Sequence, residues 1–120
     1  MKNVTLVLGA SLNPNRYSNI AIKRLVNKGI DVRAIGLREG SVSDIKIEIE
    51  KKQYDSIDTV TLYLNPKRQE EYYKYIIDLK PRRVIFNPGT ENMELVKLLK
   101  DNGIESEIAC TLVLLSTNQY

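Results

Sequence analysis

An apolar run that ends in glycine constrains the fold of this chain more than any other feature. The run extends from Val4 to Leu8 and ends at Gly9. Continuous apolar character, without polar alternation, is typical of a strand buried on both faces. Such strands occur in parallel sheets that are covered by helices on both sides. The beginning of the chain therefore predicts a central parallel strand followed by a loop and a helix.

The remainder of the chain alternates between strand-like and helix-like segments. Strands are predicted at 31–35, 58–64, 82–86 and 104–108, and helices begin at Ser18, at Asn65-Pro66 and at Thr90 or Asn92, with a short closing helix within 109–115. Asn before Pro is a helix start, and Gly29 and Gly103 are helix stops. This order implies right-handed crossovers and a parallel sheet. We expect the α/β class: a Rossmann-like three-layer α/β/α sandwich with about five mainly parallel strands, in one domain spanning 1–120.

Two neighbouring segments are harder to interpret. Residues 36–43 contain Gly and Ser and are expected to form a connector. Ile45, Ile47 and Ile49 alternate with charged residues, which predicts a half-exposed edge strand, although a helix is an open alternative. An exposed edge strand would allow two copies of the chain to pair as a homodimer.

The absence of histidine restricts the chemistry of the chain. Without histidine, and with Cys110 as the single cysteine, the sequence excludes a Ser-His-Asp or Cys-His catalytic set and an intramolecular disulfide, and it argues against a zinc site. No apolar run approaches the roughly 20 residues of a membrane helix, and no signal peptide is evident. We expect a cytoplasmic protein, more a binding protein than an enzyme, with no membrane partner.

Positive charge is concentrated near the beginning of the chain. Residues 1–40 contain seven Lys and Arg against two Asp and Glu, a net charge of +5, whereas the whole chain carries +3. This asymmetry indicates an anionic ligand near the first part of the fold. A solvated helix face is the alternative for Lys23, Arg24 and Lys28. The basic residues are scattered and no nucleic-acid motif is present, so nucleic acid is not an expected partner.

The loop from Gly9 to Ser18 carries the strongest functional signal. In an open parallel sheet, ligands bind outside the carboxyl ends of the strands. Gly9 and Ala10 are small enough for a ligand to approach, the following helix offers free N–H groups to an anion, and Arg16 suits a forked phosphate contact. The loop is neither Gly-x-Gly-x-x-Gly nor a P-loop. The alternative is a tight packing turn without a ligand.

The same residues resemble a known motif. Gly9-Ala10-Ser11, Pro14 and Ser18 match the Gly-Ala-Ser-x-x-Pro-x-x-x-Ser motif of the small CoA-binding domain proteins. That family is Rossmann-like and is similar to the CoA-binding domain of the succinyl-CoA synthetase alpha subunit. The resemblance extends over essentially the whole chain, through 58–66 and through 86–92. It departs from the family where Ala34-Ile35-Gly36-Leu37 replaces Pro-x-Asn-Pro, Leu64 replaces Arg and Asn87 replaces Gln, and a C-terminal His is missing.

The resemblance implies that the cofactor is coenzyme A, whose phosphates match the basic first forty residues. The residues it implies for binding are Gly9, Ala10, Ser11, Asn13, Pro14, Arg16, Tyr17, Ser18, Arg38, Asn65, Asn87, Pro88, Gly89 and Asn92. The alternative to a phosphate contact by Arg38 is that its side chain is a solvated charge in a loop. Cys110 is either a small buried hydrophobe or a partner of the CoA thiol in a mixed disulfide.

Two functional hypotheses follow. The first is a non-catalytic CoA or acyl-CoA binding module with a cofactor-binding or regulatory role, because a phosphate loop is present without an evident catalytic set. The second is an NADP-dependent oxidoreductase or an acyl-CoA transferase-type enzyme. NADP stays open because Arg38, after the second predicted strand, suits a ribose 2′-phosphate.

Overall fold

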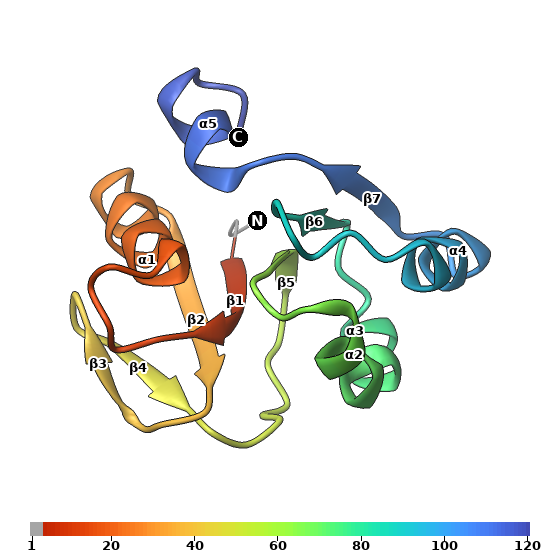
Figure 1. Cartoon of the computed structure of the whole chain (residues 1–120), viewed down its shortest axis with the longest axis horizontal. Coiled ribbons are helices and arrows are strands. Elements are labelled where there is room, and N and C mark those ends of the chain that lie inside the picture. The colour runs from red at the N-terminus through yellow and green to blue at the C-terminus, as the bar shows by residue number, and fades with distance from the viewer. Residues whose placement is uncertain (1–3) are drawn as a thin grey trace.

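A sheet of seven strands forms the centre of the molecule (Figure 1). The structure is a computed structural model that describes residues 4–120. The strands are β1 (Val4–Ala10), β2 (Asp31–Gly36), β3 (Gly40–Val42), β4 (Ile45–Glu48), β5 (Ile57–Leu62), β6 (Arg83–Phe86) and β7 (Glu105–Ile108). Their spatial order is β3-β4-β2-β1-β5-β6-β7, and every neighbouring pair is parallel except β3 with β4. The predicted class and central parallel strand are confirmed.

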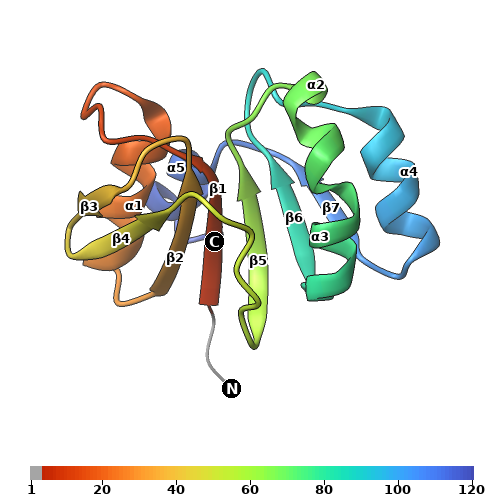
Figure 2. The ribbon, with the colours of Figure 1, turned by 90° about the horizontal axis from the view of Figure 1, so that it is seen from below.

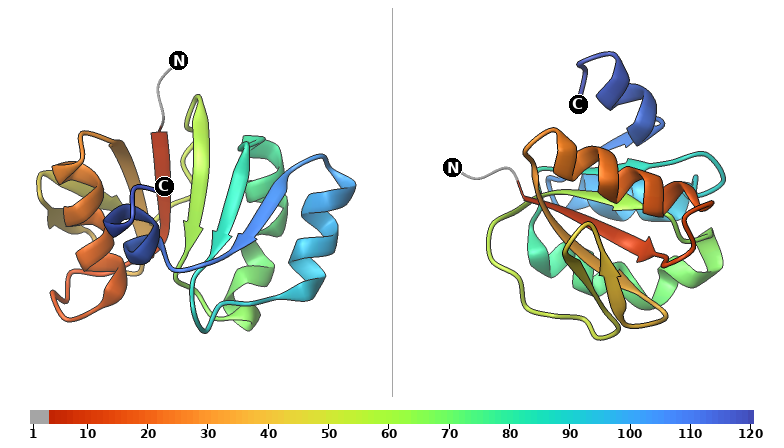
Figure 3. Two further views of the ribbon diagram at one scale, coloured as in Figure 1. Left: turned by 90° about the horizontal axis from the view of Figure 1, so that it is seen from above. Right: turned by 90° about the vertical axis from the view of Figure 1, so that its left-hand side faces the viewer.

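Helices cover both faces of this sheet. They are α1 (Tyr17–Asn27), α2 (Pro66–Gln69), a 3-10 turn η1 (Glu70–Tyr72), α3 (Tyr73–Leu79), α4 (Met93–Asp101) and α5 (Thr111–Ser116). Figures 2 and 3 show α1 and α5 on one face, and α2, α3 and α4 on the other. None of the helices in 4–120 has the length and apolar character needed to cross a membrane.

Two apolar cores lie between the sheet and its helices. Side chains alternate along a strand, so Leu6 and Leu8 of β1 face α3 and α4, whereas Val7 faces α1. The first core is completed by residues such as Val60, Leu62, Val84, Phe86, Ile76, Leu95 and Leu99. The second contains Ile22, Leu25, Val32, Ala34, Ile47 and Leu115. Because β1 contributes to both cores, it is buried on both faces, as the apolar run predicted.

The predicted helix ends are mostly confirmed. Asn65 caps α2, since its Oδ1 accepts the N–H of Arg68 at 2.9 Å, and Asn92 caps α4. The prediction of Ser18 as the cap of α1 is wrong. Arg16 occupies that position, because its carbonyl accepts the N–H groups of Asn19 and Ile20. Ser18 is buried in the first turn of α1.

The segment after β2 differs from its prediction. The expected connector 36–43 contains strand β3, which forms an antiparallel hairpin with β4. The turn consists of Ser43 and Asp44, both with positive φ, as a tight two-residue hairpin turn requires. The segment 45–49 forms a strand, as predicted, but β4 also pairs with β2, so the edge on this side of the sheet is β3. The sheet has seven strands where about five were predicted. The exposed edge at 45–49, on which the predicted homodimer was based, is absent.

Candidate functional site

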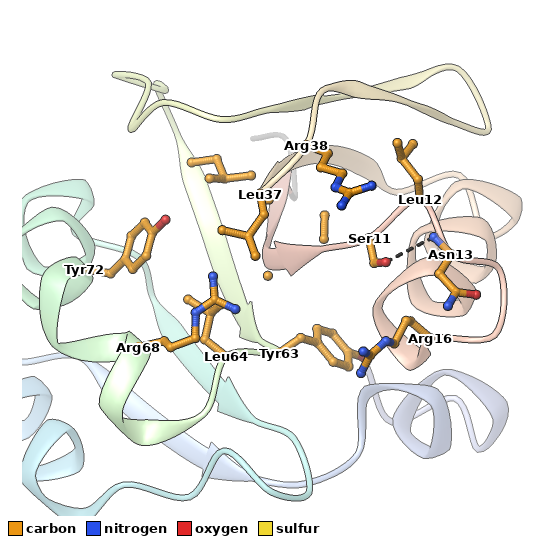
Figure 4. Close-up of a pocket in the computed structure, with 14 residues that line it drawn as sticks. Ser11, Leu12, Asn13, Arg16, Leu37, Arg38, Tyr63, Leu64, Arg68 and Tyr72 are labelled. Carbon is orange, nitrogen blue, oxygen red and sulfur yellow. Dashed lines mark hydrogen bonds between the residues drawn. The ribbon is translucent and has the colours of Figure 1, made fainter.

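A cavity of about 500 Å³ opens at the carboxyl ends of β1, β2 and β5 (Figure 4). β2 and β5 flank β1 on opposite sides, which makes this the switch point where open α/β sheets bind ligands. We call it the switch-point cavity. It is lined by Gly9, Ala10, Ser11, Leu12, Asn13, Arg16, Ile35, Gly36, Leu37, Arg38, Tyr63, Leu64, Arg68 and Tyr72.

Closely packed backbone forms the base of the cavity. Gly9 has a φ of +100°, and a Cβ there would lie 2.9 Å from the carbonyl carbon of Tyr63. A Cβ at Gly36 would lie 2.2 Å from the carbonyl oxygen of Ala10. Both distances are shorter than a side chain tolerates, so glycine is required at each position. The ends of β1, β2 and β5 can therefore approach one another and leave room above them for a ligand.

The loop between β1 and α1 is ordered by its own hydrogen bonds. Ser11 Oγ accepts the N–H of Asn13 at 3.1 Å, and Asn13 Oδ1 accepts the N–H of Asn15 at 2.9 Å. Asn19 Nδ2 donates to the carbonyl of Ser11 at 2.9 Å and links the loop to the first turn of α1. The loop thus has a defined shape beside the positive end of a helix, which favours anions.

Three arginines give the cavity its charge. Arg16 lies in the loop before α1, Arg38 follows β2, and Arg68 lies on α2. In Figure 4 their side chains reach the cavity from three different directions. No acidic side chain is among the described lining residues, and no ion pair joins these arginines to the rest of residues 4–120. The cavity therefore presents a concentration of positive charge without an internal counter-charge.

Tyr63 forms part of the wall beside Leu64. Burial raises the pKa of Tyr63 to about 12, so its hydroxyl stays protonated at neutral pH. The hydroxyl is buried near Thr61 and Thr111 but makes no hydrogen bond of normal length to a described residue. A protonated phenol cannot act as a general base, and it leaves the wall of the cavity neutral.

The structure places the predicted binding residues in two groups. Six of them line the cavity together: Gly9, Ala10, Ser11, Asn13, Arg16 and Arg38. The others lie outside this lining. Pro14, Tyr17, Pro88 and Gly89 are exposed, Ser18 is buried, and Asn65 and Asn92 cap helices. Cys110 precedes α5, half-buried and outside the lining, and its disulfide with CoA stays a prediction.

Asn87 holds elements of the fold together. Its Nδ2 donates to Thr61 Oγ1 at 2.6 Å and to the carbonyl of Leu62 at 2.9 Å. Its Oδ1 accepts the N–H of Thr111 at 2.8 Å. The side chain is buried, and these bonds connect the ends of β5 and β6 to the start of α5. They use both of its amide N–H donors and its carbonyl oxygen within the protein.

The sequence did not predict all of the lining residues, and the main omissions are Arg68 and Tyr72. The family resemblance has an arginine at the end of the strand predicted at 58–64, where this chain has Leu64. Leu64 is buried and packs close to Gly9, whereas Arg68, one helical turn later, extends into the cavity. A basic residue in the first turn of a helix that follows a parallel strand was the available signal, because that turn lies at the carboxyl edge of the sheet.

The fold and the position of the cavity define a Rossmann-like protein with a basic cavity at the switch point of its sheet. A family model described as a CoA binding domain matches residues 3–116. The chain belongs to this CoA binding domain family. The resemblance read from the Gly9–Ser18 motif is therefore confirmed.

Solved structures share the fold over nearly the whole chain. A crystal structure of an uncharacterized protein has a TM-score of 0.96 at 47% identity and covers 100% of this chain and 99% of its own. A hypothetical protein from Pyrococcus horikoshii OT3 has a TM-score of 0.84 at 29% identity, with coverage of 97% and 82%. A dinucleotide-forming acetyl-coenzyme A synthetase from Ca. Korarchaeum cryptofilum, solved with phosphate and ADP, has a TM-score of 0.73 at 16% identity, with coverage of 87% and 25%. This last likeness concerns the fold alone. A search of curated proteins found no match.

Proposed function

We propose that the protein binds coenzyme A or an acyl-CoA in the switch-point cavity and acts as a binding module without catalytic activity. The observation that carries this proposal is the set of three arginines, Arg16, Arg38 and Arg68, in a cavity whose described lining has no acidic residue. CoA contains a diphosphate and a ribose phosphomonoester, which together require several positive partners. Arginine matches phosphate oxygens with two parallel N–H donors.

The backbone around the loop supports the same ligand. Gly9 and Gly36 keep side chains out of the base of the cavity, and the loop from Ser11 to Arg16 is already ordered next to the first turn of α1. A diphosphate over a helix start receives N–H groups and a favourable dipole. Little conformational entropy is then lost on binding.

The lining favours binding over catalysis. Its titratable groups are arginines and the phenols of Tyr63 and Tyr72, and burial raises the pKa of both tyrosines. Acid-base catalysis near neutral pH requires a group whose pKa lies near the working pH. Neither an arginine nor a tyrosine with a raised pKa meets that requirement.

A second candidate is an NADP-dependent oxidoreductase, with an acyl-CoA transferase-type enzyme as the related alternative. Arg38 follows β2 and lines the cavity, in the region where an arginine accommodates the 2′-phosphate of NADP. CoA and NADP share a diphosphate and a ribose phosphomonoester, so the charges alone suit both. The family membership favours CoA.

Isothermal titration calorimetry with CoA, acetyl-CoA, NADP, NAD and ATP tests the proposal. We expect CoA and acetyl-CoA to bind most tightly. Arg16→Gln should weaken both by at least about tenfold, since a charged hydrogen bond is worth about 1.5–3 kcal/mol. Arg24→Gln is the matched control, because Arg24 lies on α1 but outside the lining. Tighter binding of NADP, or turnover of NADPH with carbonyl substrates, would favour the oxidoreductase. No binding of CoA at millimolar concentration would contradict the proposal.

A further inference from the structure

We propose that the short helix α5 responds to occupancy of the switch-point cavity, and that Tyr63 connects the two. A ligand packed against the Tyr63 ring would bring its hydroxyl into a hydrogen bond with Thr111, the first residue of α5, and hold the helix more firmly on the sheet. Tyr63 is thus a positioning residue. This inference rests on the proposed function, and it gives the binding module an element that changes when the ligand is bound.

The side chain of Tyr63 reaches from the cavity towards α5. Tyr63 directly follows β5 and lines the cavity. In Figure 4 its ring lies beside Arg16, which belongs to the loop before α1. The ring also packs against the second apolar core, which contains Leu115 of α5. A ligand that contacts Arg16 therefore lies next to a side chain that packs with α5.

The Tyr63 hydroxyl is an unused donor. It is buried, and it makes no hydrogen bond of normal geometry to any group of residues 4–120. Thr61 and Thr111 lie near it. Because burial raises the pKa of Tyr63 to about 12, the phenol is protonated at neutral pH and can donate. A buried hydroxyl without a partner is unfavourable, so a small movement that gives it one is favoured.

Thr111 can accept this hydrogen bond. Its Oγ1 is hydrogen-bonded to Thr61 Oγ1 at 2.8 Å, and Asn87 Nδ2 donates to Thr61 Oγ1 at 2.6 Å. A hydroxyl offers one donor and two acceptor positions, so Thr111 Oγ1 keeps a free position after its bond to Thr61. Asn87 Oδ1 accepts the N–H of Thr111 at 2.8 Å, which fixes the backbone at the start of α5. Thr111 is fully buried, so this position is closed to bulk solvent.

Helix α5 is short enough for one hydrogen bond to matter. It contains six residues, too few for a helix to be stable by itself. Leu114, Leu115 and the polar contacts of Thr111 attach it to the rest of the protein. Elements with few buried contacts open locally at low free energy. Val113 is 54% exposed, so a change in α5 occurs at the surface, where a partner can detect it.

Amide hydrogen exchange followed by NMR, with and without CoA, measures this response. The reporters are the amides of Leu114 and Thr117, which donate to the carbonyls of Cys110 and Val113, both at 3.0 Å. The unchanged protein and Tyr63→Phe are compared at the same multiple of their own Kd, so that stabilisation by mass action is equal. We expect CoA to slow these amides about three- to tenfold more in the unchanged protein, the factor that one additional hydrogen bond contributes. The amides of α4, on the other face of the sheet, should slow equally in both proteins.

Two variants remove the two partners of the proposed bond. Tyr63→Phe keeps the ring, and because the hydroxyl has no partner in the free protein, the free variant should be at least as stable in urea. Its CoA affinity should fall by about three- to tenfold, since coupling between α5 and the ligand is reciprocal. Thr111→Val removes the acceptor, and its effect on CoA affinity should not add to that of Tyr63→Phe. Tyr72→Phe is the matched control, because Tyr72 also lines the cavity but lies on η1, and it should retain the α5 response.

The outcomes separate this inference from the proposed function. If the unchanged protein does not bind CoA, the proposed function fails. If it binds CoA but the α5 amides slow equally in the unchanged protein and Tyr63→Phe, the link through Tyr63 is wrong and the proposed function stands. A free Tyr63→Phe protein that is less stable than the unchanged one would show that the hydroxyl is already bonded without a ligand, which also overturns the inference. Additive losses of CoA affinity in Tyr63→Phe and Thr111→Val would mean that the two hydroxyl groups act separately.

Discussion

Arginines lie in cavities at both ends of the sheet, and their surroundings differ. The switch-point cavity at the carboxyl end contains Arg16, Arg38 and Arg68 without an acidic partner in its described lining. A second cavity of about 290 Å³ lies at the amino end and contains Arg82 and Arg83. There each arginine is bonded to other groups of the protein. The two cavities therefore contain the same residue type, but only the arginines at the amino end have partners within the fold.

The pairs at the amino end are specific. Arg82 makes a forked contact with Asp58, with Nε and Nη2 at 3.0 and 3.1 Å from the two carboxylate oxygens. Arg83 is buried, and it donates to Thr59 Oγ1 at 3.0 Å, to Glu107 Oε1 at 2.9 Å and to the backbone oxygen of Tyr120 at 2.9 Å. Its guanidinium carbon also lies 4.5 Å from the centre of the Tyr120 ring.

The comparison distinguishes arginines that are bonded within the fold from arginines whose charge is available to a ligand. An arginine whose donors are satisfied by the protein contributes to folding and has little left to offer a ligand. An arginine in a cavity without a counter-charge adds repulsion to the folded state and gains a partner only when an anion binds. Substitutions at the amino end should therefore change stability, and those at the carboxyl end should change affinity.

Removal of Arg83 should produce the largest loss of stability. Arg83→Met leaves Thr59, Glu107 and the Tyr120 carbonyl without their donor, and breaking a buried charged network of this kind costs about 2–4 kcal/mol. Glu107 is 40% exposed and can regain water, which keeps the loss at the lower end of that range. Urea denaturation at neutral pH measures the difference. Arg38→Met is the control and should stay within about 0.5 kcal/mol of the unchanged protein. Equal losses in the two variants would remove the distinction between the two ends.

Short sequence patterns predicted several features of the two ends. The apolar run before Gly9 predicted the central strand, and Asn65-Pro66 predicted the start of α2. The basic first forty residues predict an anionic ligand. Pairing across the sheet was not readable, because Arg83 and Glu107 are 24 residues apart and meet only once β6 and β7 are adjacent. For the same reason Arg68 was missed, since its place in the cavity depends on how α2 follows β5. The alternation at 45–49 predicted β4, but β3 was missed because a three-residue strand carries too little periodicity.

The base of the switch-point cavity should be sensitive to a single methyl group. Gly36→Ala places a Cβ 2.2 Å from the carbonyl oxygen of Ala10, so the backbone of β1 or β2 must move. We expect a loss of about 1–3 kcal/mol in the free energy of unfolding. We also expect at least a severalfold loss of CoA affinity, since Ala10 ends β1 and leads directly into the loop before α1.

Gly40→Ala is the matched control for that substitution. The three atoms nearest to its Cβ would all belong to the Leu12 side chain, the first at 2.5 Å, and a leucine side chain can rotate away. Its loss of stability, measured by urea denaturation, should be clearly smaller than that of Gly36→Ala. If the two alanine variants behave alike, close backbone contact does not determine the shape of this end of the molecule.

The Asp58–Arg82 pair should give the smallest effect, and one that depends on pH. The hydrogen bonds from Arg82 hold the pKa of Asp58 below its usual value of 3.8. A lowered folded-state pKa contributes stability that is present above the unfolded-state pKa and is lost as the pH falls through the folded-state value. The unfolding free energy of the unchanged protein should therefore fall from about pH 5 downward, and that of Asp58→Asn should fall less steeply.

The size of this effect is limited by solvent. Arg82 is 55% exposed, so the pair is worth less than about 1 kcal/mol at neutral pH. Asp78→Asn removes the surface pair with Lys74, whose two side chains are 88% and 56% exposed, and it should change the acid slope less than Asp58→Asn does. Urea titrations between pH 2.5 and 7 measure the three slopes. A loss at neutral pH in Asp58→Asn as large as that in Arg83→Met would mean that burial does not distinguish the two arginines of the amino end. Equal slopes in Asp58→Asn and the unchanged protein would mean that the fork between Arg82 and Asp58 does not persist in solution.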